Sequence, residues 1–174
     1  AHAPWGDKSA AAIQAYSIKI CDMLLQQGCK LILIACNSAS AVAHELVKEY
    51  VGRKAVVVDV VDPMIEYLAE NYVDKTIGLI GTKQTIHSNI YRKKLDQRGI
   101  NIQLNTLATP LLVPLIEEGA SNQEIMIDVI KSYLSEPSLQ TVDALVLGCT
   151  HYPLIKKHIA QFYENKAVII DSTG

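Results

Sequence analysis

Short apolar runs alternate with amphipathic stretches along the chain, and this alternation limits the fold more than any other feature. The runs are rich in Ile, Leu and Val. Such runs predict buried strands, whereas apolar residues that recur at helical spacing predict helices. Strand–helix alternation favours an α/β fold with mainly parallel sheets, in which ligands bind beyond the carboxyl ends of the strands.

The boundaries of the predicted elements follow from the same pattern and from turn residues. Ser9 is a suitable N-cap, Gly28 a suitable stop, and Pro63 is well tolerated at a helix start. The predicted strands span residues 31–35, 55–59, 76–81, 100–107, 144–148 and 167–171. The predicted helices span residues 9–27, 38–50, 85–99, 111–118, 122–134 and 153–163, with another that begins at Pro63.

Charge and hydropathy exclude several classes of protein. The net charge is −2, with acidic and basic residues interspersed, so there is no basic stripe and nucleic-acid binding is not expected. No apolar run approaches the roughly 20 residues that span a bilayer, and no secretory signal opens the chain. We therefore expect a cytosolic protein without a membrane partner. Both ends look cut, which predicts a fragment of a longer protein.

The cysteine pattern argues against a metal site. Cys21, Cys29, Cys36 and Cys149 form no CxxC pair, and no histidine spacing completes a zinc pattern. In a cytosolic chain free thiols are expected rather than disulfides. Cys21 and Cys29 have no polar cluster beside them, and a structural role is predicted for both.

Cys36 and Cys149 follow predicted strands in the same way. Residues 31–40 read LILIACNSAS, and residues 144–153 read ALVLGCTHYP. Each segment is an apolar strand, a small residue, a cysteine, two polar residues and a helix start. The repeated design suggests two similar halves.

A cysteine at a strand-to-helix turn suits proton transfer. Unpaired backbone amides and the helix dipole favour the thiolate there. Two such thiols facing one substrate could remove a proton from one side and return one to the other. The neighbouring Asn37, Ser38, Thr150 and His151 can hold a small polar ligand. A lone cysteine after a strand is usually a small buried hydrophobe, and it is the matched pair that favours catalysis.

Other polar residues carry weaker signals. Thr82 and Thr85 follow the strand at 76–81, where they can cap a helix or bind a carboxylate. His151 can cap backbone, orient a ligand, or act as acid or base beside Cys149. Ordinary surface or half-buried positions are predicted for His44, His87 and His158, and solvated charge for Glu117 and Glu118. Gly78 and Gly81 do not form a GxGxxG motif, so a dinucleotide site is poorly supported.

Several motifs resemble those of the glutamate racemases in the aspartate/glutamate racemase family. Residues 35–40 (ACNSAS) and 148–154 (GCTHYPL) are similar to the family's two cysteine motifs. Residues 4–9 (PWGDKS) look like its PYGxKS segment, and residues 80–86 and 113–119 also match family stretches. The resemblance covers essentially the whole chain in the right order.

The resemblance implies an isomerase that interconverts L- and D-glutamate without pyridoxal phosphate or a metal. Cys36 would take the proton from D-glutamate and Cys149 from L-glutamate, with His151 as a further catalytic candidate. It also implies D-glutamate supply for peptidoglycan, a cytoplasmic location and, in some members, a homodimer. Substrate binding is implied for Trp5, Gly6, Asn37, Ser38, Thr150 and His151, and less strongly for Thr82 and Thr85.

The resemblance also implies two similar α/β domains with the active site in the cleft between them. The first domain would hold residues 1–60 and 171–174 and be incomplete, and the second would hold residues 61–170. The family's opening strand with its Asp-Ser motif is absent, so this chain is expected to be weakly active. Trp5 and Ser38 stand where the family has Tyr and Thr.

Two other kinds of function stay open at this point. One is racemisation of another amino acid, such as aspartate, by the same two cysteines. The other is binding without turnover, either of a small acid, of a partner protein or, with weaker support, of a nucleotide. Deuterium exchange at the α-carbon separates a racemase from a binder.

Overall fold

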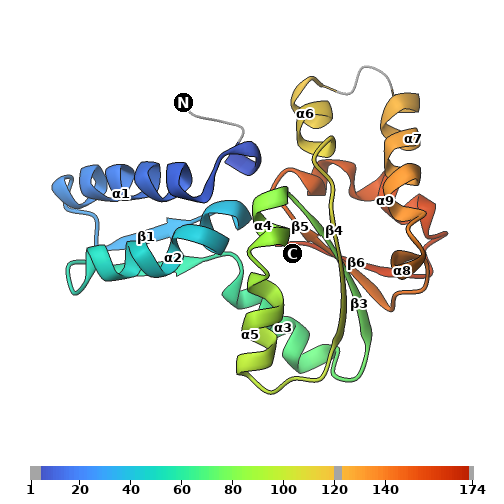
Figure 1. Ribbon diagram of the computed structural model, residues 1–174, viewed down its shortest axis with the longest axis horizontal. Helices are drawn as coiled ribbons and strands as arrows, with labels where there is room; N and C mark the ends of the chain where they lie inside the picture. The colour runs from blue at the N-terminus through green and yellow to red at the C-terminus, as the bar shows by residue number, and fades with distance from the viewer. Residues whose placement is uncertain (1–4, 120–122, 173–174) are drawn as a thin grey trace.

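The computed structural model describes residues 5–119 and 123–172, and it consists of two parallel sheets with helices packed on them (Figure 1). The smaller sheet pairs β1 (Leu31–Ile34) with β2 (Val56–Asp59). The larger sheet has the order β4-β3-β5-β6 and is parallel throughout. Its strands are β3 (Thr76–Gly81), β4 (Gln103–Ala108), β5 (Ala144–Gly148) and β6 (Val168–Ile170). The predicted α/β class with parallel sheets is confirmed.

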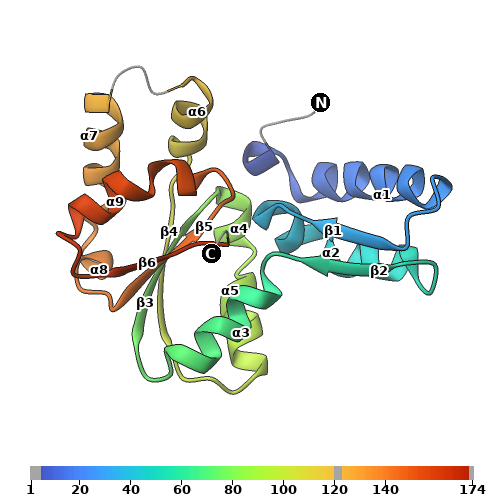
Figure 2. The same cartoon turned by 180° about the vertical axis from the view of Figure 1, so that it is seen from behind.

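Helices cover the smaller sheet on one face. Helices α1 (Ala10–Gln26) and α2 (Asn37–Val51) pack on β1, and Ile32 is buried between them. Figure 2 shows β1 and β2 on the near side with α2 behind them. The prediction of a fully buried strand at 31–35 is wrong, because Leu31 is 62% exposed and Leu33 58%. Alternate side chains of a strand point to opposite faces, and the described residues cover only one.

Helices cover the larger sheet on both faces. One core includes Leu145 and Leu147 of β5, and the opposite core includes Ala144 and Val146. All five residues of β5 are buried. This is the burial expected of a central strand in a parallel sheet with helices on both sides. On one side lie α3 (Asp62–Asn71) and α5 (Ile90–Gln97), and on the other α6 (Leu112–Glu117), α7 (Gln123–Leu134), α8 (Pro137–Gln140) and α9 (Lys156–Phe162).

Helix caps agree with the sequence at two predicted positions. The Ser9 side chain accepts the N–H of Ala12 at the start of α1. Gly28 follows this helix with a φ of 81°, a left-handed conformation that glycine adopts without a steric penalty. The α3 helix begins at Asp62, one residue before Pro63. The predicted helix start at Asn122 lies outside the described residues.

The structure corrects several other boundaries. The helix predicted over 85–99 is two helices, α4 (Lys83–His87) and α5, because Asn89 between them has a φ of 57°. A left-handed residue of this kind interrupts a right-handed helix. The strand predicted from residue 100 begins at Gln103. Short 3-10 turns, η1 (Trp5–Asp7) and η2 (Tyr152–Ile155), and the α8 helix were not predicted.

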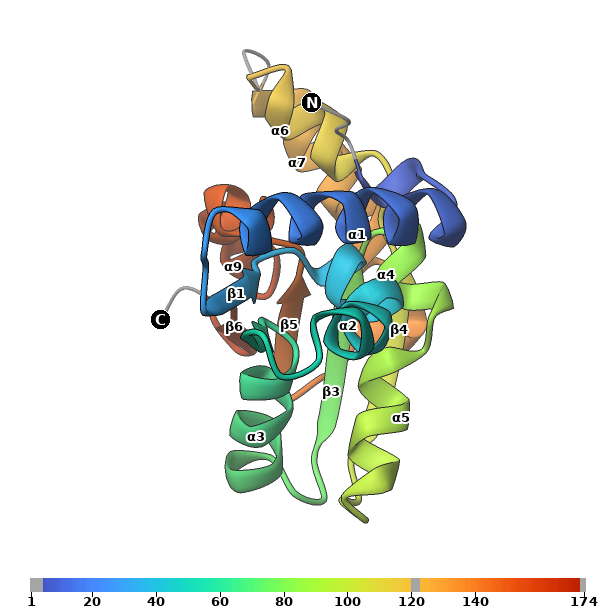
Figure 3. The ribbon, with the colours of Figure 1, turned by 90° about the vertical axis from the view of Figure 1, so that its left-hand side faces the viewer.

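The two sheets are joined through helices that contact each other. In Figure 3, α2 lies next to α4, and the two helices are in contact. Within the described residues, no helix has the length and apolar character needed to cross a membrane.

Candidate functional site

The two motif cysteines line one cavity, although they belong to different sheets. Cys36 follows β1 and Cys149 follows β5. The cavity measures about 210 Å³, and we call it the cysteine cavity. It is lined by Trp5, Gly6, Cys36, Asn37, Ser38, Thr82, Val113, Glu117, Cys149, Thr150 and His151. Of the site residues predicted from sequence, Thr85 alone is missing from this lining.

Cys36 stands at the N-cap of α2. Its carbonyl accepts the N–H of Ser40, and its side chain makes no capping bond. The thiol is half-buried and free. Asn37 and Ser38 form the first turn of the same helix, so all three side chains lie at the helix end whose amides favour an anion.

Cys149 has a more enclosed environment. Its side chain is 7% exposed, and burial raises the pKa of this thiol from 9.0 to about 11. The backbone N–H of His151 lowers the pKa, the charge of Cys36 raises it, and the N–H of Tyr152 lowers it. Because desolvation prevails, Cys149 carries its proton at neutral pH.

Cys149, His151 and Glu117 form a row of contacts. Nδ1 of His151 lies 3.8 Å from the Cys149 sulfur, and Nε2 lies 3.1 Å from a Glu117 carboxylate oxygen. The carboxylate can only accept, so Nε2 of His151 donates to it. A neutral imidazole then has Nδ1 free to accept from the Cys149 thiol.

Three hydroxyl groups form a chain that begins at the cavity lining. Ser38 and Thr82 share a hydrogen bond of 2.7 Å, and Thr82 donates to Thr85 at 3.2 Å. The Thr82 oxygen also accepts the N–H of Thr85, which makes it the N-cap of α4. Thr82 therefore both caps a helix and faces the cavity, whereas Thr85 is buried behind it.

Gly6 lies close against the side chain of Thr82. A Cβ on Gly6 would lie 2.6 Å from Cγ2 and 2.7 Å from Cβ of Thr82. Any larger residue at this position therefore requires Thr82 or the η1 turn to move. Trp5 packs edge-on against Tyr16 with ring centroids 6.2 Å apart, and both Trp5 and Gly6 reach the cysteine cavity through the η1 turn.

The chain is similar to proteins of one known family. A family model described as Asp/Glu/Hydantoin racemase matches residues 3–174. The chain belongs to this family. Glutamate racemase of Geobacter metallireducens is 37% identical over 99% of the chain, and that of Aquifex pyrophilus is 38% identical over 99%. The chain spans 63% and 66% of the length of these two racemases.

Solved racemase structures share the fold. The glutamate racemase of Francisella tularensis in complex with D-glutamate has a TM-score of 0.88 at 35% identity, over 98% of this chain and 63% of that one. The aspartate racemase of Picrophilus torridus has a TM-score of 0.64 at 21% identity, over 91% of this chain and 64% of that one. At that identity the second likeness concerns the fold alone.

Glu117 is the site residue of this racemase-family chain that sequence reasoning missed. It is exposed, as the prediction of solvated charge requires, but it also lines the cysteine cavity and pairs with His151. The sequence did offer one signal for this role, because Glu117 belongs to the stretch at 113–119 that resembles the racemase family. Val113, from the same stretch, adds an apolar wall. Glu118 is exposed, as predicted.

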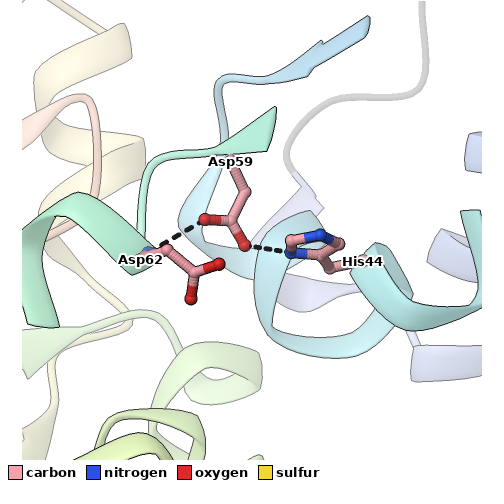
Figure 4. Close-up of side chains that lie close together, drawn as sticks. All are labelled: His44, Asp59 and Asp62. Carbon is pink, nitrogen blue, oxygen red and sulfur yellow. Dashed lines mark hydrogen bonds and ion pairs between the residues drawn. The ribbon is translucent and has the colours of Figure 1, made fainter. Parts of the chain in front are cut away.

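A second cluster of polar side chains, His44, Asp59 and Asp62, lies outside the cysteine cavity (Figure 4). His44 was predicted to be at or near the surface, but it is buried, and its Nδ1 contacts Asp59. The other Asp59 oxygen accepts the N–H groups of Val61 and Asp62.

Lys94 completes this cluster, because its Nζ lies 2.5 Å from Asp62. The carboxylates thus already have protein donors. We interpret the cluster as a set of polar interactions that links α2, β2 and α3, and not as a cation-binding site. The four cysteines are free, as expected.

Proposed function

We propose that the protein interconverts L-glutamate and D-glutamate. The observation that carries the proposal is the cysteine cavity, where one thiol from each sheet meets the same space. Two relatives, 37% and 38% identical, are glutamate racemases, and the related Francisella tularensis structure contains D-glutamate. These likenesses support glutamate as the substrate.

The proposed mechanism moves one proton off the α-carbon and another onto its opposite face. With D-glutamate bound, the Cys36 thiolate takes the α-proton, and the electron pair of the C–H bond stays on carbon. The Cys149 thiol then donates its proton to the other face and becomes a thiolate. Burial keeps the Cys149 thiol protonated, and an acid in this direction must carry a proton. The two roles are exchanged when L-glutamate is the substrate.

His151 is proposed to assist proton transfer at Cys149. Its Nδ1 faces the sulfur, and Glu117 stabilises the imidazolium that forms if it accepts the thiol proton. Trp5, Gly6, Asn37, Ser38, Thr82 and Thr150 are proposed to bind substrate, and Thr85 to support Thr82 from behind.

The physiological setting follows from the same proposal. We propose a cytoplasmic enzyme that supplies D-glutamate for peptidoglycan and works as a homodimer. We further propose that the two sheets are the cores of two domains divided near residues 60 and 171. Proton transfer by two thiols needs neither pyridoxal phosphate nor a metal. Weak activity of the 174-residue chain alone stays a prediction.

Deuterium exchange tests the proposal directly. Protein incubated with L-glutamate or D-glutamate in D₂O should remove the α-proton signal from the NMR spectrum and form the other enantiomer. Cys36→Ser and Cys149→Ser should each slow racemisation by at least about 100-fold. Cys29→Ser, which alters a half-buried cysteine outside the cavity, should leave the rate unchanged.

The other outcomes identify the alternatives. Exchange with aspartate and not with glutamate would point to the aspartate racemases. Saturable glutamate binding with no exchange would indicate a binding protein. Racemisation that survives both cysteine substitutions would contradict the two-thiol mechanism.

A further inference from the structure

Tyr91 forms a hydrogen bond with Asn37, a residue that lines the cysteine cavity, and does not itself line that cavity. It lies on α5, is 2% exposed and is not part of the cavity lining. Its hydroxyl donates to Oδ1 of Asn37 at 2.8 Å, across 54 positions of sequence. Asn37 is itself buried and lines the cavity at the start of α2. The bond therefore joins a helix of the larger sheet to the cysteine-bearing end of α2.

The direction of this hydrogen bond is set by the Asn37 atom that faces Tyr91, because an amide oxygen can only accept. Burial, and then the negative charge of Asp59, raise the pKa of the Tyr91 hydroxyl well above its ordinary value of 10.0. The hydroxyl keeps its proton at every pH at which the protein would work. It acts as the donor, and the Asn37 carbonyl oxygen is its acceptor.

The consequence for Asn37 follows from the two ends of its amide. The side chain has one acceptor oxygen and one NH₂ group with two donors. With the oxygen bound by Tyr91, the NH₂ end is the part of the amide available to a ligand in the cavity. Carboxylate oxygens only accept hydrogen bonds, so this orientation attracts them. A half-turn of the amide would present its oxygen instead, and the two acceptors would repel.

We propose that Tyr91 is a positioning residue that fixes the Asn37 amide with its NH₂ group toward a carboxylate of the substrate. This inference rests on the proposed function, because glutamate is the carboxylate ligand. Ser38 and Thr82 form a second hydrogen bond between α2 and the larger sheet. A hydroxyl group can donate or accept in any rotamer, so this bond does not select one orientation of a ligand-binding group. The amide has two distinct ends, and Tyr91 selects between them.

The ring and the hydroxyl of Tyr91 have separable roles. The ring packs in the core with Leu95 and Ile65, and phenylalanine would preserve that packing. Tyr163 provides a matched control, since it is also buried and its hydroxyl donates to the Leu139 carbonyl at 2.8 Å. Tyr163 does not line the cysteine cavity.

Steady-state kinetics give the first test. Tyr91→Phe should raise KM for both glutamate enantiomers about tenfold, the loss expected for a misdirected bond to a charged group, and leave kcat within about twofold. Tyr163→Phe should change neither constant. In an Asn37→Ala background, Tyr91→Phe should have no further effect on KM, because the residue it acts through is gone. An unchanged KM, or additive effects in the double variant, would overturn the proposal.

A second test needs no turnover. In ¹³C,¹⁵N-labelled protein, the Asn37 side-chain carbonyl resonance should shift in Tyr91→Phe and not in Tyr163→Phe. Adding D-glutamate to the unmodified protein should shift the Asn37 NH₂ resonances. If the unmodified protein exchanges no α-proton of glutamate while the carbonyl resonance still responds to Tyr91→Phe, the proposed function fails and the positioning by Tyr91 stands. A carbonyl resonance that ignores Tyr91→Phe would reject the positioning itself.

Discussion

The hydroxyl oxygens of Ser38 and Thr82 lie 2.7 Å apart, although 44 positions separate them in the sequence. Ser38 belongs to the first turn of α2, and Thr82 caps α4. The Thr82 hydroxyl donates its only proton to Thr85, so Ser38 is the donor in the bond between Ser38 and Thr82. This bond joins the helix that follows Cys36 to the larger sheet at the edge of the cysteine cavity.

Loss of the Thr82 hydroxyl should lower the stability of the protein. Thr82→Val keeps the shape but removes the cap of α4 and the acceptor for Ser38. We expect a decrease of about 1–2 kcal/mol in the free energy of unfolding, measured by urea denaturation. Thr82→Ser retains the hydroxyl and should stay closer to the unmodified protein. Equal stability of the valine and serine variants would contradict the capping role.

A methyl group at Gly6 should disturb the cavity. In Gly6→Ala the new Cβ would lie 2.6 Å from Cγ2 of Thr82, so the η1 turn or Thr82 must move. We expect KM for glutamate to rise about tenfold, as displacement of a binding contact predicts. Asp7→Ala, an exposed position in the same turn, is the control. A Gly6→Ala enzyme with unchanged KM would show that the turn adapts without cost.

The pKa of Cys149 predicts its reactivity as a function of pH. Because the pKa is raised from 9.0 to about 11, the thiol persists to higher pH. At pH 8 the thiolate fraction should be about 100-fold lower than that of an unperturbed thiol. Mass spectrometry of iodoacetamide labelling should show a Cys149 rate that still rises between pH 9 and pH 11. A plateau near pH 9 would contradict the raised pKa.

Removal of the Glu117 charge should slow turnover in both directions. Glu117→Gln keeps the size of the side chain but no longer stabilises an imidazolium at His151, 3.1 Å away. We expect kcat/KM to fall about tenfold or more. The two enantiomers have equal free energies, so the fall must be the same for each substrate. Glu118→Gln is the neighbouring control. Similar rates for the two variants would argue against a role for Glu117 in the reaction.

Local pattern was sufficient for most of the secondary structure. The predicted bounds of β3 and β5 agree with the structure, and the Ser9 cap and the Gly28 stop are present. Such features depend on side-chain periodicity and on residues within one turn of each other. The break at Asn89 was missed, because an asparagine within a helical pattern does not reveal a left-handed conformation.

Local patterns of residues were enough to establish the α/β class, the strand–cysteine–helix design at Cys36 and Cys149, and the resemblance that led to the family. Three features became known only from the packing of the elements: Glu117 faces His151, Tyr91 binds Asn37, and β1 has an open face. Periodicity and capping act over a few neighbouring residues. Contacts between elements depend on how the sheets and helices pack, and no local pattern encodes that arrangement.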